Sequence, residues 1–242
     1  MAELLPPERL TLREHLEELR RRLLLVVATA AVAAIVAFAY AERLIHWLKA
    51  PAGDQLPRLA FFSPTEALTA TMKVAVFCGA VAALPVALTQ LWAFVRPALT
   101  PKQHRYGVAF VWWGSILFVA GAAVAYYVML PLFLNFLLGF GRSYGEPIIS
   151  LNQYLSFVTG IMLACGAVFE LPLVVFLLTR VGLVTSQALQ RQRGLALIVL
   201  LIVAAILTPT TDAVSLLIFT GPLWLLYEAS IFVARLSNRQ SR

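Results

Sequence analysis

Apolar runs alternate with short polar segments along the whole chain. The first run, Leu23–Tyr40, reads LLLVVATAAVAAIVAFAY and carries no charge. Several runs are long enough to cross a bilayer core of about 30 Å, and together they are too many for one buried core. Because lipid offers no partner to an open strand edge, membrane-spanning segments are expected to be helices. The pattern predicts an all-α integral membrane protein.

Six spans follow from the runs and from the turn signals between them. In SPTEAL, Ser63 and Glu66 have the spacing of a capping box, and SLNQYL repeats it as Ser-x-x-Gln. Pro131 is expected to end the third span, and the stretch LFLNFLLGFG after it is too short to cross and is expected at the interface. The predicted spans are approximately 23–40, 64–92, 107–130, 153–179, 194–207 and 213–233.

The last two spans are short. Residues 194–207 give about 21 Å of helix at about 1.5 Å per residue, and the sixth span is interrupted by Pro222 and carries Glu228. Short spans thin the bilayer or require partners. We therefore expect the C-terminal hairpin to sit in a deformed membrane.

Composition and charge fix the class and the orientation. The 242 residues are 61% hydrophobic and 13% charged, against about 25% charged in a soluble domain. With the N-terminus inside, the inner segments hold 14 of the 19 Lys and Arg, the outer loops four, and Lys73 lies within a span. This bias follows the positive-inside rule. It predicts a single membrane domain over residues 1–242, with residues 1–22 and the C-terminus in the cytoplasm.

A cleaved signal peptide is the competing interpretation of residues 1–40. The apolar run has 18 residues, longer than the usual h-region of about 7–15, and no A-x-A site ends it. We therefore expect a retained span. The two cysteines, Cys78 and Cys165, lie inside apolar runs and are expected to be small buried side chains rather than a disulfide.

Enzyme motifs are missing from the sequence. It contains no G-x-x-x-x-G-K-[ST] phosphate loop, no H-E-x-x-H and no G-x-S-x-G. The three histidines are scattered near predicted membrane edges. We expect no catalytic site, no metal, no cofactor and no nucleic-acid partner.

Polar side chains within the spans are the candidates for function. Glu170 lies two residues before Pro172 in the fourth span, where a bend is expected; it either makes an internal hydrogen bond or meets a ligand. Glu228 either anchors the sixth span, for instance to Arg235, or acts in function. Lys73 is expected to be structural, reaching toward the interface.

Charge is densest just before the first span, in REHLEELRRR. The arginines at its end suit a positive-inside flank, but carboxylates contribute little to orientation. Glu14 and Glu18 stand four residues apart, so the two like charges share a helix face at a small cost in stability. A face that receives a cationic partner would explain this arrangement.

Six segments in order resemble the TatC family, the multi-span subunit of the twin-arginine protein translocase. The resemblance covers essentially the whole chain. The segments are HLEELRRRL, QLWAFVRPALTPKQHR, YLSFV, FELPLVVFLL, ILTPTTDAVSLL and PLWLLYEASIF.

The resemblance implies a function and a setting. TatC proteins are not enzymes; they bind Arg-Arg signal peptides of folded precursors and work with TatA- and TatB-type single-span partners. Export is driven by the proton-motive force. The family implies a cup-like curved bundle, a multi-copy complex and the prokaryotic cytoplasmic (inner) membrane.

Site residues carry over from the family by position. Glu18 matches its N-terminal acidic residue, with Arg20 beside it, and Glu170 matches its intramembrane glutamate. Gln103 stands where the family often has a glutamate facing the paired arginines, and an amide lacks the charge of a carboxylate. Other matches are Phe94, Pro97 and Leu99 in the loop after the second span, and Thr208, Pro209 and Asp212 after the fifth; TPTTD is one residue longer than the usual TPPD, and Asp212 is alternatively a helix cap.

Two other functions stay open on the residues alone. A proton-coupled small-molecule secondary transporter would use Glu170 and Glu228 as proton relays, although no internal repeat of the kind common in such folds is evident. A passive membrane scaffold would need neither Glu18 nor Glu170.

Overall fold

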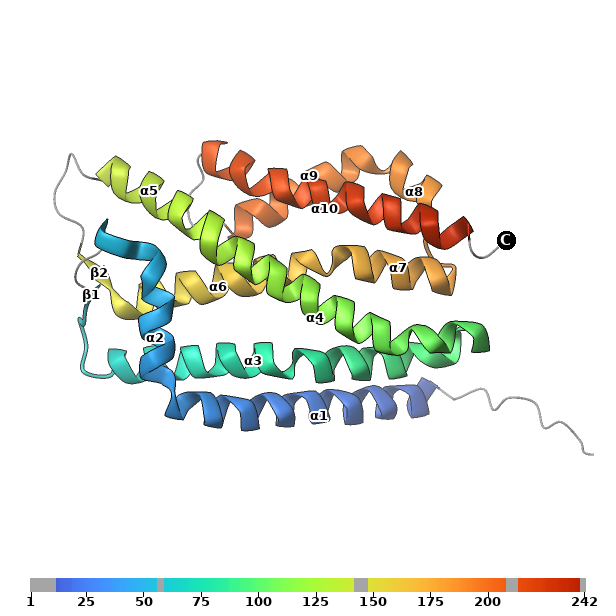
Figure 1. The fold of residues 1–242 in the computed structure, drawn as a ribbon, viewed down its shortest axis with the longest axis horizontal. Helices are drawn as coiled ribbons and strands as arrows, with labels where there is room; N and C mark the ends of the chain where they lie inside the picture. The colour runs from blue at the N-terminus through green and yellow to red at the C-terminus, as the bar shows by residue number, and fades with distance from the viewer. Residues whose placement is uncertain (1–11, 56–58, 142–147, 208–212, 240–242) are drawn as a thin grey trace, which may run out of the picture.

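Helices make up nearly all of the computed structural model, which describes residues 12–55, 59–141, 148–207 and 213–239. The one sheet in this part of the chain pairs two short parallel strands, β1 and β2. The long helices lie side by side, and α2 crosses them near the strands (Figure 1). The elements are α1 (Leu12–Ala39), α2 (Ala41–Lys49), the 3₁₀ segment η1 (Ala50–Gln55), β1 (Leu59–Ala60), α3 (Glu66–Val95), η2 (Arg96–Ala98), η3 (Pro101–Tyr106), α4 (Gly107–Val124), the π segment η4 (Ala125–Met129), α5 (Leu130–Gly141), β2 (Ile149–Ser150), α6 (Leu151–Phe169), α7 (Leu171–Val181), α8 (Ser186–Arg191), α9 (Arg193–Leu207) and α10 (Ala213–Arg239).

Four helical segments of the described chain are long and apolar enough to cross a membrane, and α9 is a shorter apolar helix. They occupy the places of the first four predicted spans and of the short fifth span. The sixth predicted span falls on α10, which has 27 residues, so the expectation of a short sixth helix is wrong; α10 continues through Pro222 rather than being interrupted there. The four segments are Arg13–Ala39, Glu66–Val95, Gln103–Gly139 and Leu151–Val181.

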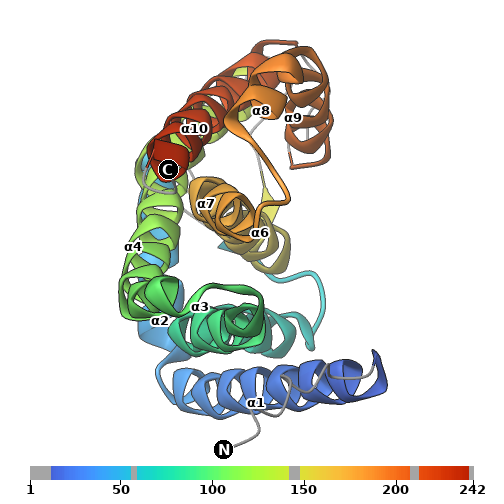
Figure 2. The same cartoon turned by 90° about the vertical axis from the view of Figure 1, so that its right-hand side faces the viewer.

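The bundle is curved. Figure 2 shows α1, α3, α4 and α10 along an arc, with α6 and α7 on its inner side. The start of α1 and the end of α10 lie at one end of the bundle, which we call the termini end (Figure 1). The strands lie at the other end, which we call the strand end.

One predicted helix end is wrong. The helix that begins with α4 does not stop before Pro131 but continues through η4 into α5 as far as Gly141. A proline in a helix lacks the N–H and crowds the carbonyl four residues earlier. Here the turn just before Pro131 is widened, and the Leu130 N–H donates to the Ala125 carbonyl five residues back. The wider turn lets the helix accept the proline.

A break in the fourth span is confirmed next to its proline. The span divides into α6 and α7 at Glu170, two residues before Pro172. The start of α6 also agrees with the sequence, because the Ser150 hydroxyl caps it by accepting from the Gln153 N–H at 3.2 Å. The start of α3 differs: Glu66 is its first residue, and the Ser63 carbonyl, not its side chain, accepts the Glu66 N–H.

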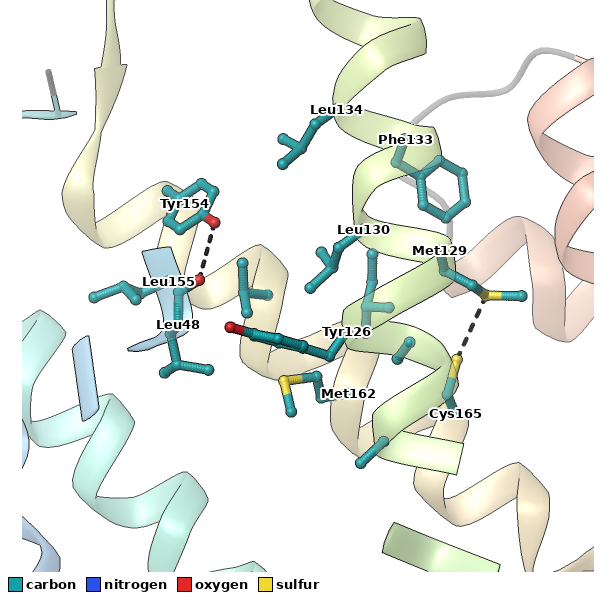
Figure 3. Close-up of a cluster of buried hydrophobic side chains, with 14 of the residues drawn as sticks. Leu48, Tyr126, Met129, Leu130, Phe133, Leu134, Tyr154, Leu155, Met162 and Cys165 are labelled. Carbon is teal, nitrogen blue, oxygen red and sulfur yellow. Dashed lines mark hydrogen bonds between the residues drawn. The ribbon is translucent and has the colours of Figure 1, made fainter. Parts of the chain in front are cut away.

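The main core lies at the strand end, between α2, α3, α6 and the α4–η4–α5 helix (Figure 3). Two tyrosine hydroxyls hold α2 there: Tyr154 donates to the Leu48 carbonyl at 3.0 Å and Tyr126 to the Trp47 carbonyl at 2.6 Å. The Trp47 carbonyl also accepts the Ala50 N–H at the end of α2, so the two hydroxyls add contacts that tie this helix end to η4 and α6. As expected, Cys165 is buried and is a free thiol, 3.7 Å from the Met129 sulfur; Cys78 is also a free thiol but, against expectation, is only partly buried.

A second, smaller core lies at the termini end. It joins α3, α4 and α7 and packs the loop after α3 against them. Its buried members are Leu88, Trp92, Leu99, Phe110, Leu173 and Leu177.

Candidate functional site

The charged opening of the chain and its first apolar run form one unbroken helix, α1, which packs along α3. Near its start, the Glu18 carboxylate accepts hydrogen bonds from Arg22 Nε at 3.0 Å and from Arg22 Nη2. The remaining terminal nitrogen of Arg22 donates to Gln90 Oε1 of α3 at 3.1 Å. Glu18 is therefore held in place by a cation that is itself fixed to the neighbouring helix.

Two hollows lie side by side over this contact. The first, of about 340 Å³, is lined by four charged or polar residues and one leucine: Glu18, Arg21, Arg22, Gln90 and Leu25. The second, of about 300 Å³, is mainly apolar and is also bordered by Arg22 and Gln90. Its other lining residues are Leu19, Leu23, Val26, Ala87, Leu88, Leu91 and Phe94. A carboxylate-bearing surface thus adjoins an apolar one.

His15 joins the two parts of this surface, and the sequence did not indicate it. Its ring stacks on Phe94, with centroids 4.3 Å apart and an interplanar angle of 21°. Its Nδ1 lies 3.9 Å from Glu18 Oε2. The predicted residues Glu18 and Phe94, 76 positions apart in the chain, are therefore bridged by one imidazole.

Arg20 and Glu14 occupy different positions around α1. Arg20 is exposed and lies about 200° around the helix from Glu18. The two side chains therefore do not share a face. Glu14 is exposed one turn before Glu18, on the same side of the helix.

The loop after α3 uses its predicted residues for its own structure. The Gln103 side-chain oxygen accepts the Thr100 N–H at 3.0 Å, while the Gln103 N–H donates to the Thr100 carbonyl at 2.8 Å. Leu99 is 6% exposed in the small core, and Pro97 is exposed. Gln103 and Leu99 thus shape the loop, and only part of the predicted motif faces outward.

Glycine is required where this loop enters α4. A Cβ on Gly107 would lie 2.4 Å from Trp92 Nε1, closer than atoms can approach. The indole of Trp92 occupies that space and also packs at 5.1 Å on the Phe110 ring. The loop is therefore anchored at both Leu99 and Gly107.

Glu170 lies at the break between α6 and α7, and its backbone carbonyl accepts the N–H groups of Leu173 and Val174, both at 2.9 Å. Both of its side-chain oxygens are buried and have no hydrogen-bond partner among the described residues. A Cβ on Gly114 of α4 would approach Glu170 Oε2 to 3.3 Å. Within the described chain, the structure thus offers no internal hydrogen bond, and a buried carboxyl without one is costly.

Glu228 has a partner, but not the expected one. Its carboxylate accepts from Arg193 Nη2 at 2.8 Å, across from α10 to the start of α9, and not from Arg235. Beside it, the Tyr227 hydroxyl donates to the Leu189 carbonyl of α8 at 2.7 Å. Both contacts fix the C-terminal helices to one another, which supports an anchoring role for Glu228. Arg193 was missed because it is near Glu228 only in three dimensions.

Glu66 is a second acid whose contacts the sequence did not reveal. It is buried, its Oε2 accepts the Phe62 N–H at 2.7 Å, and its Oε1 accepts the Asn152 N–H at 3.2 Å and the Ser150 hydroxyl. Instead of completing a local box with Ser63, it ties the start of α3 to the start of α6. Lys73 joins the same helices by donating to the Ser156 hydroxyl at 2.8 Å. This contact with α6 is consistent with the structural role expected for Lys73.

Three predicted positions, Thr208, Pro209 and Asp212, lie outside the described residues. In the described ranges, no three His, Cys, Asp or Glu side chains gather as a metal site.

Comparison with known proteins identifies relatives over nearly the whole chain. The family model "Sec-independent protein translocase protein (TatC)" matches residues 14–222. The chain is similar to the Sec-independent protein translocase proteins TatC of Carboxydothermus hydrogenoformans (36% identical, covering 93% of each chain) and Aquifex aeolicus (35% identical, covering 96% of this chain and 97% of the other). Its fold is similar to a crystal structure of the twin arginine translocase receptor TatC, with a TM-score of 0.83, 35% identity, and coverage of 93% of this chain and 100% of the other.

Proposed function

The chain belongs to the TatC family, the translocase subunits of the twin-arginine pathway, and from this we propose that its α1–α3 surface at the termini end is the twin-arginine signal-peptide receptor. One observation carries the proposal: the hollow that contains Glu18 adjoins an apolar hollow across the same two helices. A signal peptide carries paired arginines before an apolar stretch, so its arginines would match the hollow with Glu18 and its apolar stretch would match the apolar hollow.

Glu18 is the proposed acceptor of the arginine pair. A carboxylate takes a guanidinium through two charge-assisted hydrogen bonds, and in the structure Glu18 already takes Arg22 in this way through Nε and Nη2. An incoming arginine would share or replace that contact. Arg22 can keep its bond to Gln90 when it releases Glu18.

Residues of the α3–α4 loop support this surface in different ways. Phe94 lines the apolar hollow and is held by the His15 ring. Leu99 anchors the loop in the small core, and Gln103 closes its turn. We assign direct contact with the peptide to Glu18 and Phe94, peripheral contact to Pro97 and Arg20, and a shaping role to Leu99 and Gln103.

Glu170 is the proposed contact for a single-span partner of the TatA or TatB type. Its oxygens are buried, one of them against Gly114 of α4, and have no hydrogen-bond partner in the described chain. A polar group of a partner helix that reached this carboxyl would remove the cost of leaving it unsatisfied. TatA/TatB-type proteins in a multi-copy complex therefore fit the structure as proposed partners.

The setting follows from the charge distribution. The termini end carries the segments rich in Lys and Arg, so we place that end, with both termini, on the cytoplasmic side of the prokaryotic inner membrane. The TatC family is a transport family and not a known enzyme family. We propose that folded precursors cross with energy from the proton-motive force.

A matched pair of substitutions tests the receptor. Glu18→Gln removes the charge of the proposed acceptor, whereas Glu17→Gln removes an exposed charge about 100° away around α1. We expect Glu18→Gln to weaken binding of an Arg-Arg signal peptide to the purified protein by about tenfold or more, since hydrogen bonds to charged groups contribute about 1.5–3 kcal/mol. Glu17→Gln should bind within about twofold of the unmodified protein. Equal losses in the two variants, measured by fluorescence anisotropy, would contradict the assignment of Glu18.

A further inference from the structure

An apolar pocket of about 460 Å³ lies at the strand end, away from the signal-peptide surface, between α2, α3, α6 and the α4–η4 helix. Almost all of its lining is carbon. Trp47 and Tyr127, 47% and 69% exposed, form its rim, while Met162 of α6, 4% exposed, lies at its floor. The volume falls within the range of about 300–1,000 Å³ that is typical of ligand pockets.

The depth of the pocket suits the hydrocarbon region of a bilayer. Cys78 and Ala82 line it on α3, 12 and 16 residues after the start of that helix at Glu66. At about 1.5 Å per residue they lie roughly 18–24 Å along α3, within a hydrocarbon core of about 30 Å. Lipid, rather than water, therefore meets the opening of the pocket.

Helix α2 places an interfacial rim above the pocket. It runs across the long helices (Figure 1), and the Trp47 ring stacks on Tyr126 with centroids 4.3 Å apart and an interplanar angle of 9°. Tryptophan and tyrosine are enriched where membranes meet water. The pocket thus begins at the level where lipid headgroups end.

A cation stands beside this rim. Arg43 is exposed and precedes Trp47 by one turn of α2, so the two side chains are neighbours on one face. Among the described residues, no ion pair holds Arg43. Lys49, six residues after Arg43, points to the other flank of the helix. Arg43 could hold a phosphate while the pocket below Trp47 holds an acyl chain, and a phospholipid carries both groups in one molecule.

We propose that this pocket binds one acyl chain of a membrane phospholipid whose phosphate is held by Arg43. The site is independent of signal-peptide recognition, since none of its residues borders the Glu18 surface. A bound lipid fills a space that would otherwise leave its apolar walls without contacts. It also covers the contact between α2 and the main core.

Cys78 reports on this pocket directly. It lines the pocket, whereas Cys165, the second of the two cysteines, is 2% exposed and serves as an internal reference. The experiment measures the rate at which N-ethylmaleimide alkylates Cys78 in protein stripped of lipid in dodecyl maltoside. The rate is read by mass spectrometry as phosphatidylglycerol or uncharged diacylglycerol is added. We expect phosphatidylglycerol to slow alkylation of Cys78 severalfold at concentrations where diacylglycerol has little effect.

Two variants on α2 test the phosphate contact. Arg43→Ala should raise the concentration of phosphatidylglycerol that gives half-protection by about tenfold, the equivalent of one hydrogen bond to a charged group. Lys49→Ala removes the same charge from the other flank and should leave that concentration unchanged. Equal protection by the two lipids, or equal effects of the two variants, would overturn the role of Arg43.

Further variants serve as controls that distinguish lipid binding in the pocket from general lipid contact at the surface and from self-association of the protein. Ile35 of α1 is 74% exposed, so the Ile35→Cys variant, combined with Cys78→Ala, reports on surface lipid alone. Ala82→Phe fills the pocket from its open side and should slow alkylation of Cys78 without lipid. Protection of the Ile35→Cys thiol equal to that of Cys78 would overturn the proposal. Protection that rises with protein concentration without lipid would do the same, because it would assign the pocket to an interface between copies.

Discussion

At the scale of single residues, the proposed recognition depends most on the contact between Glu18 and Arg22. Arg22 occupies the carboxylate that we propose as the acceptor of the arginine pair, and it is tethered to α3 through Gln90. Both side chains are about one-quarter exposed. Ion pairs four residues apart on a helix surface contribute only about 0.3–0.5 kcal/mol, and this pair is still partly open to solvent, so the contact can preorganise Glu18 and still be exchanged.

Removal of this internal competitor should strengthen ligand binding. We expect Arg22→Gln to tighten binding of an Arg-Arg peptide by about twofold to fivefold, which corresponds to a contribution of about 0.4–1 kcal/mol from this partly buried pair. Arg21→Gln removes a cation from the lining of the same hollow but leaves the Glu18 contact intact. Titration of labelled peptide into each variant separates the two effects. Equal gains would show that general charge, rather than release of Glu18, controls affinity.

The role of Gln103 also depends on a single atom, its side-chain oxygen. Its side-chain oxygen closes the turn with the Thr100 N–H, and a glutamate can form the same capping contact. We expect Gln103→Glu to keep the loop and to bind the Arg-Arg peptide as well as, or better than, the unmodified protein. Gln103→Ala should weaken binding, since loss of a capping contact costs about 0.5–2 kcal/mol. A large loss with Gln103→Glu, measured in the same titration, would contradict this account of the loop.

At the scale of elements, α2 shows how a short helix is fixed across the spans. Its carbonyls at Trp47 and Leu48 accept hydroxyl hydrogen bonds from Tyr126 and Tyr154, which come from distant helices; Figure 3 shows the second of these bonds. The Ser150 and Asn152 contacts of Glu66 act similarly between α3 and α6. Buried hydrogen bonds at element ends thus set the geometry of the strand end.

Loss of one such hydroxyl should destabilise the protein measurably. Tyr154→Phe leaves the buried Leu48 carbonyl without this donor, at an expected cost of about 1–3 kcal/mol in the free energy of unfolding. Tyr127→Phe removes a hydroxyl from a ring that is 69% exposed and should have little effect. Thermal unfolding in detergent should therefore show a lower Tm for Tyr154→Phe alone. An unchanged Tm for that variant would show that the hydroxyl does not hold α2.

At the scale of the whole molecule, hydropathy predicts the helices well because each apolar run must satisfy its backbone within lipid. The first four spans, the short α9 and the break at Glu170 follow from local patterns in this way. The path through Pro131 could not be predicted, because it depends on a widened turn that packing selects. The Arg193 partner of Glu228 and the α6 partners of Glu66 depend on contacts between segments far apart in sequence.

The candidate site, too, could be predicted from the sequence only in part. Family motifs identified Glu18, Phe94 and Glu170, and the structure brings Glu18 and Phe94 together through His15. Motifs alone could not show which residues face outward and which shape the loop. The sequence around Leu99 and Gln103 reads the same whether these side chains are exposed or, as in the structure, buried (Leu99) and closing a turn (Gln103). The curvature that presents the α1–α3 surface is likewise a property of the assembled helices (Figure 2).

The central claim is that the α1–α3 surface at the termini end receives the twin-arginine signal peptide. Site-specific photo-crosslinking tests it most directly, with a probe placed in turn at positions 18, 94 and, as a reference, at Ile148, which is exposed near the strand end. We predict that a folded precursor with an Arg-Arg signal peptide crosslinks at positions 18 and 94 but not at 148. The same precursor with Lys-Lys should lose these crosslinks. Crosslinks that are equally strong at 148, or that persist with Lys-Lys, would contradict the account.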